Sequence, residues 1–98
     1  MANSGGYVYI LASGRNGTLY IGFTNNLPER MLQHKTGKGS KFAKQNKADK
    51  LVYYEYYDYA QQAILRETQM KKWERKWKLY KIEETNPMWE DLSLSLNN

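Results

Sequence analysis

Cysteine is absent from this chain of 98 residues, and histidine occurs once. Without thiols the protein can form neither a disulfide framework nor a thiolate zinc site, and it has no cysteine nucleophile. Long apolar runs are also missing, because no stretch approaches the roughly 20 residues that a membrane-spanning helix needs. Residues 1–6 lack the charged and apolar regions of a secretory signal. We therefore expect a soluble, cytoplasmic protein with no membrane partner.

The length of the chain predicts one domain, residues 1–98, because there is no room for a second core. A domain this small buries only about 60 to 65% of the surface that its unfolded chain exposes. We expect its stability to be modest, since neither a disulfide nor a structural zinc ion can add to it.

The basic residues fall in two blocks. Six lysines lie between residues 33 and 50, seven basic residues lie between 66 and 81, and residues 82–98 carry acidic charges only. This asymmetry suits a phosphate backbone that lies across one side of the domain, with an affinity that depends on salt. A solvated helix face is the alternative explanation. The residues predicted to contact nucleic acid are Lys38, Lys41, Lys44, Lys71, Lys72 and Arg75.

Two segments near the N-terminus predict a β-hairpin. Residues 7–12 and 18–23 are rich in aromatic and β-branched side chains, and Asn16-Gly17 between them accepts positive φ angles. The hairpin would carry Tyr9 and Tyr20. These rings oppose each other directly only if the turn has an even number of residues or the pairing contains a bulge. If Tyr20 opposed Ile10, the two hydroxyls would lie on opposite faces of the sheet.

A helix is predicted after the hairpin, from a cap at Asn26 to near Gly37. Pro28 in the first turn and a glutamate three positions after the cap favour this start. Arg30 and His34 lie four residues apart and therefore share one edge of this helix. Both side chains could lean over the hairpin.

The later elements are a helical turn at residues 42–46, a third strand at 51–57 and one long helix from Ala60 to about Lys81. Glu67 falls on the apolar stripe of this helix, whose other members are Ala63, Ile64, Met70 and Trp77. A carboxylate on an inward face needs a partner that satisfies it. An internal ion pair with Arg30 or a lysine is the structural explanation. Trp89 and Leu92 are expected to pack back onto the domain.

The polar side chains on these elements fit phosphodiester chemistry. Hydrolysis needs a group that orients or deprotonates water and cations that neutralise charge on the phosphate oxygens. Arg30 offers a planar fork for phosphate, and Glu67 could hold one Mg²⁺ ion, which keeps several waters. Tyrosine is a poor base at its ordinary pKa of about 10, so it needs help from a cation or from His34. Each residue alone has a structural explanation, and the combination favours catalysis.

The order of these residues resembles the GIY-YIG nuclease superfamily. The matching segments are Tyr7-Val8-Tyr9, Leu19 to Asn25, Leu27 to Arg30 with His34, Ala63 to Glu67 with Lys71-Lys72-Trp73, and Asn86-Pro87. The resemblance covers about residues 6–92 and is strongest to small bacterial members that are little more than the nuclease module. It implies an α/β (α+β) fold in which a three-stranded antiparallel sheet is flanked by helices.

The resemblance also implies roles for individual residues. The catalytic set that it carries over is Tyr9, Tyr20, Arg30, His34 and Glu67, with Gly22 and Asn86 in support. Tyr9 would act as the general base with help from His34, Tyr20 would orient water or phosphate, and Arg30 would neutralise the phosphate. Glu67 would hold a single Mg²⁺ or Mn²⁺ ion. Which of the two tyrosines is the base stays open.

Two positions depart from the family pattern. The first motif reads Tyr-Val-Tyr instead of Gly-Ile-Tyr, although Gly6 precedes it. Position 23 is phenylalanine, where DNA-repair members often have a lysine that could lower the pKa of a tyrosine. This moves the expected proton-transfer role toward His34 or toward a loop lysine such as Lys41.

The sequence therefore predicts a divalent-metal-dependent DNA endonuclease, with a role in DNA repair or recombination. Its substrate would be DNA, with structured and single-stranded forms both open, and its oligomeric state is not predicted. A nucleic-acid binding module that keeps the fold with little or no catalysis is the alternative. A third hypothesis is an interaction module that binds a protein partner through its tyrosines and through Trp73, Trp77 and Trp89.

Overall fold

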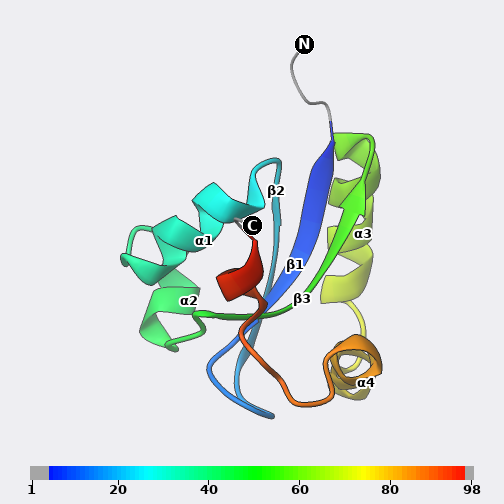
Figure 1. Ribbon diagram of the computed structural model, residues 1–98. Helices are drawn as coiled ribbons and strands as arrows, with labels where there is room; N and C mark the ends of the chain where they lie inside the picture. The colour runs from blue at the N-terminus through cyan, green and yellow to red at the C-terminus, as the bar shows by residue number, and fades with distance from the viewer. Residues whose placement is uncertain (1–4, 97–98) are drawn as a thin grey trace.

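The computed structural model describes residues 5–96, which form a three-stranded antiparallel sheet with helices on both faces (Figure 1). The strands are β1 (Gly6–Ala12), β2 (Leu19–Thr24) and β3 (Lys50–Tyr57). The helices are α1 (Leu27–Lys35), α2 (Lys41–Gln45), α3 (Ala60–Lys71) and α4 (Arg75–Thr85), followed by the short 3-10 helix η1 (Leu92–Ser95). The predicted α+β fold is confirmed. None of the helices in this part of the chain is long and apolar enough to cross a membrane.

Strand β1 lies at the centre of the sheet, in the order β2-β1-β3, and supplies both cores. Successive side chains of a strand point to opposite faces. Val8 and Ile10 pack under α3 and α4, whereas Tyr9 and Leu11 pack under α1 and α2. All four are fully buried. The residues of β1 therefore join two hydrophobic layers, and the face of α1 and α2 carries the candidate catalytic tyrosines.

The hairpin register places both tyrosines on the same face. Tyr9 pairs with Gly22, and Tyr20 pairs with Leu11, two residues further along β1. The two tyrosines are thus diagonal neighbours instead of a directly opposed pair, with ring centroids 6.3 Å apart. Diagonal neighbours on one face of a sheet remain within reach of aromatic side chains. The register that would have separated the two hydroxyls does not occur.

Helix α1 begins as the sequence predicts. The side chain of Asn26 caps it by accepting a hydrogen bond from the backbone N–H of Glu29, at 3.2 Å. The helix ends at Lys35, and Gly37 two residues later has a φ of 80°. Its buried residues include Met31 and His34. The cap and the glycine therefore fix the segment that carries Arg30 and His34.

The predicted single helix from Ala60 to about Lys81 is wrong, because the chain breaks it into α3 and α4 at residues 72–74. No glycine or proline marks this break in the sequence. Helix α4 instead turns so that Ile82 is buried in the same core as Met70. A straight helix would carry residue 82 about 16 Å beyond the end of α3, since each residue adds about 1.5 Å. The break between α3 and α4 therefore results from packing of both helices against the sheet and not from a local sequence signal.

The break also changes the predicted inward stripe. Ala63 and Met70 are fully buried, as the periodicity predicts. Ile64 is 46% exposed and Trp77 is 54% exposed, so these two do not belong to the core. Trp77 lies after the break. The predicted stripe assumed one straight helix, so it does not predict which way the Trp77 side chain points.

The C-terminal tail wraps around the outer edge of β3. Trp89 is buried in the core under α3 and α4, while Leu92 packs in the core under α1 and α2, so their predicted return is confirmed. Between them, Asp91 Oδ1 accepts a hydrogen bond from the backbone N–H of Leu51 at 3.2 Å. Its Oδ2 pairs with Lys35 Nζ at 2.7 Å. Asp91 thus covers part of a strand edge that would otherwise be open to pairing.

Replacing Asp91 with alanine should lower the free energy of unfolding by about 1–3 kcal/mol, because the buried Leu51 amide and Lys35 both lose an acceptor. Asp91→Asn should cost less, since an amide oxygen can still accept from Leu51. Urea unfolding followed by circular dichroism measures both effects. The matched control is Glu90→Ala, which removes the same charge from the exposed neighbouring side chain. Equal losses for Asp91→Ala and Glu90→Ala would contradict the proposed edge contact.

Candidate active site

Tyr9 lies at the centre of the site and packs directly over a glycine. A Cβ atom on Gly22 would lie 2.6 Å from both Cζ and Oη of Tyr9, and 3.0 Å from the ring of Tyr20. Any larger residue at position 22 would therefore push the two tyrosine rings away. This gives a physical reason for the supporting role predicted for Gly22. Because Gly22 has no side chain, the Tyr9 ring can lie close to β2, where it is fully buried.

The hydroxyl of Tyr9 lies between two side chains of α1. His34 Nε2 is 3.2 Å from Tyr9 Oη, and Arg30 Nη1 is 3.5 Å from it. Arg30 also donates to the backbone carbonyl of Phe23 at 3.4 Å. A guanidinium only donates, so the Tyr9 oxygen accepts from Arg30. Toward His34, the hydroxyl donates to Nε2 when the neutral ring carries its proton at Nδ1, and accepts from Nε2 in the other tautomer.

Burial governs the titration of this pair. Burial raises the pKa of Tyr9 to about 12. The hydrogen bond from Arg30 acts in the opposite direction, and the nearby Tyr20 and Glu67 add to the rise. Burial and the positive charge of Arg30 lower the pKa of His34. At neutral pH the pair is therefore a protonated phenol and a neutral imidazole that can accept its proton.

Aromatic rings and a glycine hold His34 in place. The His34 ring meets those of Tyr9 and Tyr20 edge to face, with centroids 5.9 and 5.7 Å apart. Phe42 of α2 stacks on Tyr20 at 6.3 Å. A Cβ on Gly39 would lie 2.4 Å from His34 Nδ1, so only glycine fits beside the ring. The contributions of Gly39 and Phe42 were not predicted. The paired glycines at 37 and 39 were the only signal in the sequence.

Glu67 approaches the site from α3, on the other side of the sheet. Its carboxylate is near enough to contribute to the pKa of Tyr9. The Glu67 side chain is only 18% exposed, and its Oε2 pairs with Lys71 Nζ at 2.9 Å. The ion pair with a neighbouring lysine, which was the structural explanation for an inward glutamate, is thus present. The structure does not pair Glu67 with Arg30.

The donor set fits one hard divalent ion only sparsely. Across residues 5–96, no three side chains of His, Asp or Glu gather into a group that could enclose a metal. Mg²⁺ commonly binds one or two protein carboxylates and takes its other ligands from water and substrate phosphate. Glu67 alone meets that minimum, provided that Lys71 moves from its carboxylate. The residues present are therefore compatible with a single magnesium ion that is shared with the substrate.

Within residues 5–96, Asn86 forms no side-chain hydrogen bond to Tyr9, Tyr20, Arg30 or His34. It lies buried at the C-terminal end of α4, and its amide nitrogen donates to the backbone carbonyls of Val52 and Glu90 at 3.1 and 2.9 Å. Its oxygen accepts from the N–H of Glu90 at 3.0 Å. These bonds join the C-terminal tail to β3. The resemblance implied a polar residue near the site, whereas the bonds of Asn86 give it a structural role.

The second basic block is partly used to hold the fold. Arg75 donates to the carbonyls of Asn16 and Gly17 at 2.8 and 2.7 Å, which ties α4 to the hairpin turn. Arg66 binds both carboxylate oxygens of Glu55, at 2.9 and 3.0 Å. Lys71 forms an ion pair with Glu67. Arg75 and Lys71, two of the predicted nucleic-acid contacts, thus already have partners within the chain, and Lys72 is exposed.

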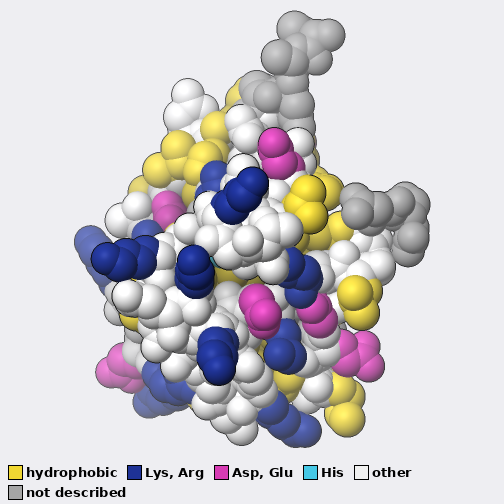
Figure 2. All heavy atoms as spheres, turned by 90° about the vertical axis from the view of Figure 1, so that its left-hand side faces the viewer, with side chains coloured by type: hydrophobic (Ala, Val, Ile, Leu, Met, Phe, Trp, Pro, Cys, Tyr) yellow, Lys and Arg dark blue, Asp and Glu magenta, His cyan; other side chains and the backbone are white. Residues whose placement is uncertain are grey.

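The first basic block is more open. Lys38, Lys41 and Lys44 are all exposed. Figure 2 shows basic side chains spread over the face formed by α1 and α2, with a few acidic side chains among them. This face also carries Arg30 and His34. A phosphate backbone would therefore meet positive charge close to the tyrosines.

Comparison with known proteins places this arrangement in a family. Residues 5–81 match the family model of the GIY-YIG catalytic domain. The chain is 37% identical over 78 residues to a UPF0213 protein of Bacillus pumilus, which covers 80% of this chain and 79% of that one. It is 36% identical over 91 residues to a UPF0213 protein of Clostridium perfringens, with coverage of 93% and 97%.

A solved structure shows the same fold. The solution NMR structure of a UPF0213 protein from Bacillus halodurans is similar with a TM-score of 0.56 and 24% sequence identity. The likeness covers 96% of this chain and 99% of that one. The likeness therefore concerns the fold of the whole domain.

The pKa of His34 should lie below its ordinary value of about 6.5. The chain has one histidine, so an NMR titration of its ring protons measures this pKa directly. His34 therefore binds a proton at a higher pH in the unfolded chain than in the folded protein. The free energy of unfolding should therefore fall as the pH drops below about 6.5 toward the folded-state pKa. His34→Gln should remove that slope, and a measured pKa of 6.5 or above would contradict the burial argument.

Gly39→Ala should displace the imidazole, because its Cβ would overlap Nδ1 of His34. We expect the hydrogen bond to Tyr9 to lengthen and the pKa of His34 to rise toward its ordinary value. Gly14→Ala is the matched control, since a Cβ there meets no atom within 4 Å. The same NMR titration reports on both variants. A His34 pKa that stays the same in Gly39→Ala would show that the loop, and not the ring, moves aside.

Proposed function

The chain belongs to the GIY-YIG catalytic domain family, and from that membership we propose that it is a Mg²⁺-dependent endonuclease that hydrolyses phosphodiester bonds in DNA. GIY-YIG domains form a nuclease superfamily. One observation carries the proposal: the Tyr9 hydroxyl is bonded to both a neutral imidazole and a guanidinium. A buried tyrosine that only packs needs a hydrogen-bond partner, but a single backbone carbonyl would satisfy it. A proton acceptor and a phosphate-binding cation are the two groups that strand cleavage requires.

The hydrogen bonds support a proton path from water to Tyr9 and on to His34. A free phenolate is unfavourable at a group whose pKa is about 12. Tyr9 therefore acts as general base only if its own proton leaves in the same step. His34 Nε2 lies 3.2 Å away and accepts that proton when the neutral ring carries its own proton at Nδ1. Burial raises the pKa of Tyr9, which makes this residue a poor base on its own. Burial also lowers the pKa of His34, which keeps the imidazole neutral and able to accept a proton.

Substrate binding must open this site, because Tyr9 is fully buried in the free protein. Tyr20 and Arg30 are only half-buried and both lie against Tyr9. Arg30 would leave the Phe23 carbonyl, which it meets at 3.4 Å, and turn its fork to the scissile phosphate. Tyr20 would then orient the water or a phosphate oxygen.

Glu67 is the residue that would hold the metal. A bound Mg²⁺ would supply Lewis-acid stabilisation of the charge that develops on the phosphate and the leaving oxygen. Lys71 neutralises Glu67 in the free protein at a distance of 2.9 Å. Because this lysine is more than half exposed, it can leave the carboxylate and bind a substrate phosphate instead.

A DNA-binding module without catalysis is the second candidate function. The observation that favours it is the complete burial of Tyr9 together with the ion pair that occupies Glu67. A module of this kind would use the lysines on the face of α1 and α2 and would never expose the Tyr9 hydroxyl. A role in DNA repair or recombination fits either candidate.

Cleavage of plasmid, branched and single-stranded DNA with Mg²⁺ or Mn²⁺ tests the proposal. Tyr9→Phe should lower the rate by about 10²- to 10⁴-fold, the usual contribution of general acid–base catalysis. Glu67→Gln and added EDTA should abolish cleavage. Glu84→Gln is the matched control, because its carboxylate forms only an exposed ion pair with Lys81. Circular dichroism confirms that each variant folds.

Two outcomes would overturn the proposal. Cleavage that continues in Glu67→Gln at the rate of Glu84→Gln would mean a contaminating nuclease or another site. DNA binding with no cleavage under any divalent ion would favour the binding module.

A further inference from the structure

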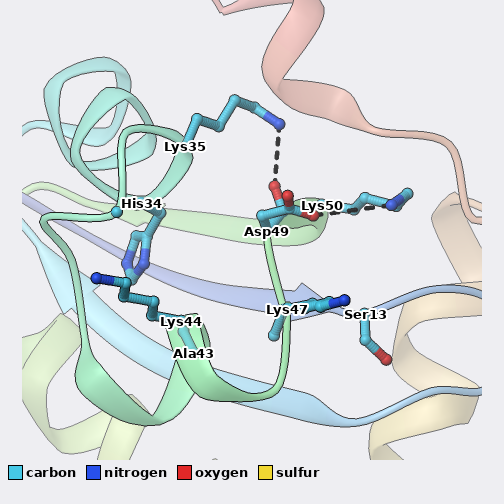
Figure 3. A pocket seen from close by; sticks show the side chains of 10 residues that line it. Ser13, His34, Lys35, Ala43, Lys44, Lys47, Asp49 and Lys50 are labelled. Atoms are coloured by element: carbon cyan, nitrogen blue, oxygen red, sulfur yellow. Dashed lines mark hydrogen bonds and ion pairs between the residues drawn. The ribbon is translucent and has the colours of Figure 1, made fainter.

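A hollow of about 380 Å³ lies beside His34, and Tyr9 is not among the residues that line it. The end of α1, helix α2 and the start of β3 form its walls, and Ser13 closes one side. Figure 3 shows His34 and Lys44 on one side of the hollow, with Lys47 and Ser13 across from them. The volume lies within the range of small-ligand sites. No residue of the proposed reaction other than His34 lines it.

The hollow is strongly basic, and part of its charge has no partner. Its lining contains four lysines and one acidic residue, Asp49. Lys35 pairs with Asp91 at 2.7 Å, and Lys50 lies 3.7 Å from Asp49. Within residues 5–96, the side chains of Lys44 and Lys47 form neither an ion pair nor a hydrogen bond. Figure 3 shows the two ammonium groups directed to opposite sides of the hollow, so these exposed side chains would turn inward to hold one anion between them.

The backbone at Lys47 is strained. Its φ is 56°, in the left-handed region that favours glycine. Helix α2 ends there in a Schellman motif, with Ala48 N–H donating to Ala43 O at 2.8 Å and Lys47 N–H donating to Lys44 O at 3.2 Å. Glycine is the usual residue at this position of the motif. Strain of this kind tends to be kept where the side chain has a function.

We propose that this hollow binds one phosphate group of the cleaved strand, a neighbour of the scissile phosphate, through Lys44 and Lys47. His34 lines the hollow and also reaches the Tyr9 hydroxyl through Nε2, so a strand that enters the hollow would pass the proton acceptor. The site would also fix which phosphate lies at Arg30. The assignment of this phosphate to the cleaved strand rests on the proposed endonuclease function. Binding of a phosphate group in the hollow does not depend on that function.

The first experiment measures phosphate binding without any cleavage. Inorganic phosphate and an unphosphorylated dinucleotide, which has a single internal phosphate, are titrated into the full chain and followed by NMR. The His34 ring and the amides of Ser13, Lys44 and Ala48 should shift together, at constant ionic strength. A dinucleotide that carries a 5′-phosphate distinguishes a terminal phosphate from an internal one. Shifts with the terminal phosphate alone would overturn the assignment to an internal phosphate of the strand.

Lys47→Gly separates binding from folding. It removes the charge and supplies the residue that the Schellman motif prefers, so the variant should fold at least as stably as the native chain. Phosphate affinity should nevertheless fall about tenfold, which corresponds to one lost charge-assisted contact of about 1.4 kcal/mol. Lys44→Gln should weaken binding similarly. The matched control Lys76→Gln/Lys78→Gln removes two charges from α4, on the other face of the sheet, and should leave the small-ligand titration unchanged.

Binding of an oligonucleotide gives a second measurement. If the two lysines share one phosphate, the Lys44→Gln/Lys47→Gly variant should reduce the slope of log affinity against log salt by about 0.7 to 0.9. A reduction of twice that size would mean two separate phosphate contacts and would contradict a single subsite. In a cleavage assay, Lys47→Gly should raise KM and leave kcat nearly unchanged.

The two proposals fail in different ways. If the native chain cleaves DNA but Lys47→Gly and Lys44→Gln bind phosphate as the native chain does, the phosphate site is wrong and the endonuclease stands. If no DNA is cleaved but phosphate shifts His34 and both variants lose that shift, the site stands and the endonuclease is wrong.

Discussion

Burial of a tyrosine on the central strand requires a glycine directly across from it. Tyr9 lies over Gly22 so closely that a single added carbon would overlap its hydroxyl. This contact fixes the hairpin register, because only position 22 leaves room for the ring. The register in turn brings Tyr20 to the same face. The hydrogen bonds to α1 follow from it, since a hydroxyl that has been removed from water must find partners within the protein.

Those partners connect the fold to the proposed chemistry. Arg30 and His34 lie one helical turn apart on α1, and both reach the same oxygen. Arg30 favours the neutral form of His34, and burial raises the pKa of Tyr9. Each shift would hinder catalysis if the residue acted alone. Together they leave a protonated phenol beside a neutral imidazole at neutral pH, with His34 Nε2 3.2 Å from the phenol oxygen.

Local rules were enough to predict the hairpin, the cap of α1 and the third strand, because turn residues, caps and alternation act within a few positions of the chain. The diagonal placement of Tyr20 was not predicted, since the close approach of Tyr9 to Gly22 involves two strands. The same holds for the break before Arg75. Residues 72–74 carry no local signal for it, and the gain comes from burying Ile82 in a core shared with β1 and β3.

The sequence predicted which residues form the candidate site, but it did not predict the distances and hydrogen bonds between them. Periodicity correctly suggested that Glu67 faces inward, yet it could not choose among Arg30, Lys71 and a metal ion as its partner. The partner in the structure is Lys71, one helical turn along α3, whereas the position of Arg30 relative to Glu67 depends on packing across the sheet. Asn86 shows the opposite case, where a motif position was carried over but its hydrogen bonds go to the tail and to Val52.

Phe23 shows how the alternation of side chains along β2 limits which groups can reach Tyr9. A Cβ on Gly6 would lie 2.5 Å from the Phe23 ring and 3.2 Å from the Cβ of Ala63, so the phenylalanine fills the space between β1 and α3. Its side chain therefore faces away from Tyr9, while its carbonyl accepts from Arg30. A lysine at this position would place its charge on the α3 side of the sheet. In the proposed mechanism the acceptor for the Tyr9 proton lies on the α1 side instead, where His34 Nε2 is 3.2 Å from the hydroxyl.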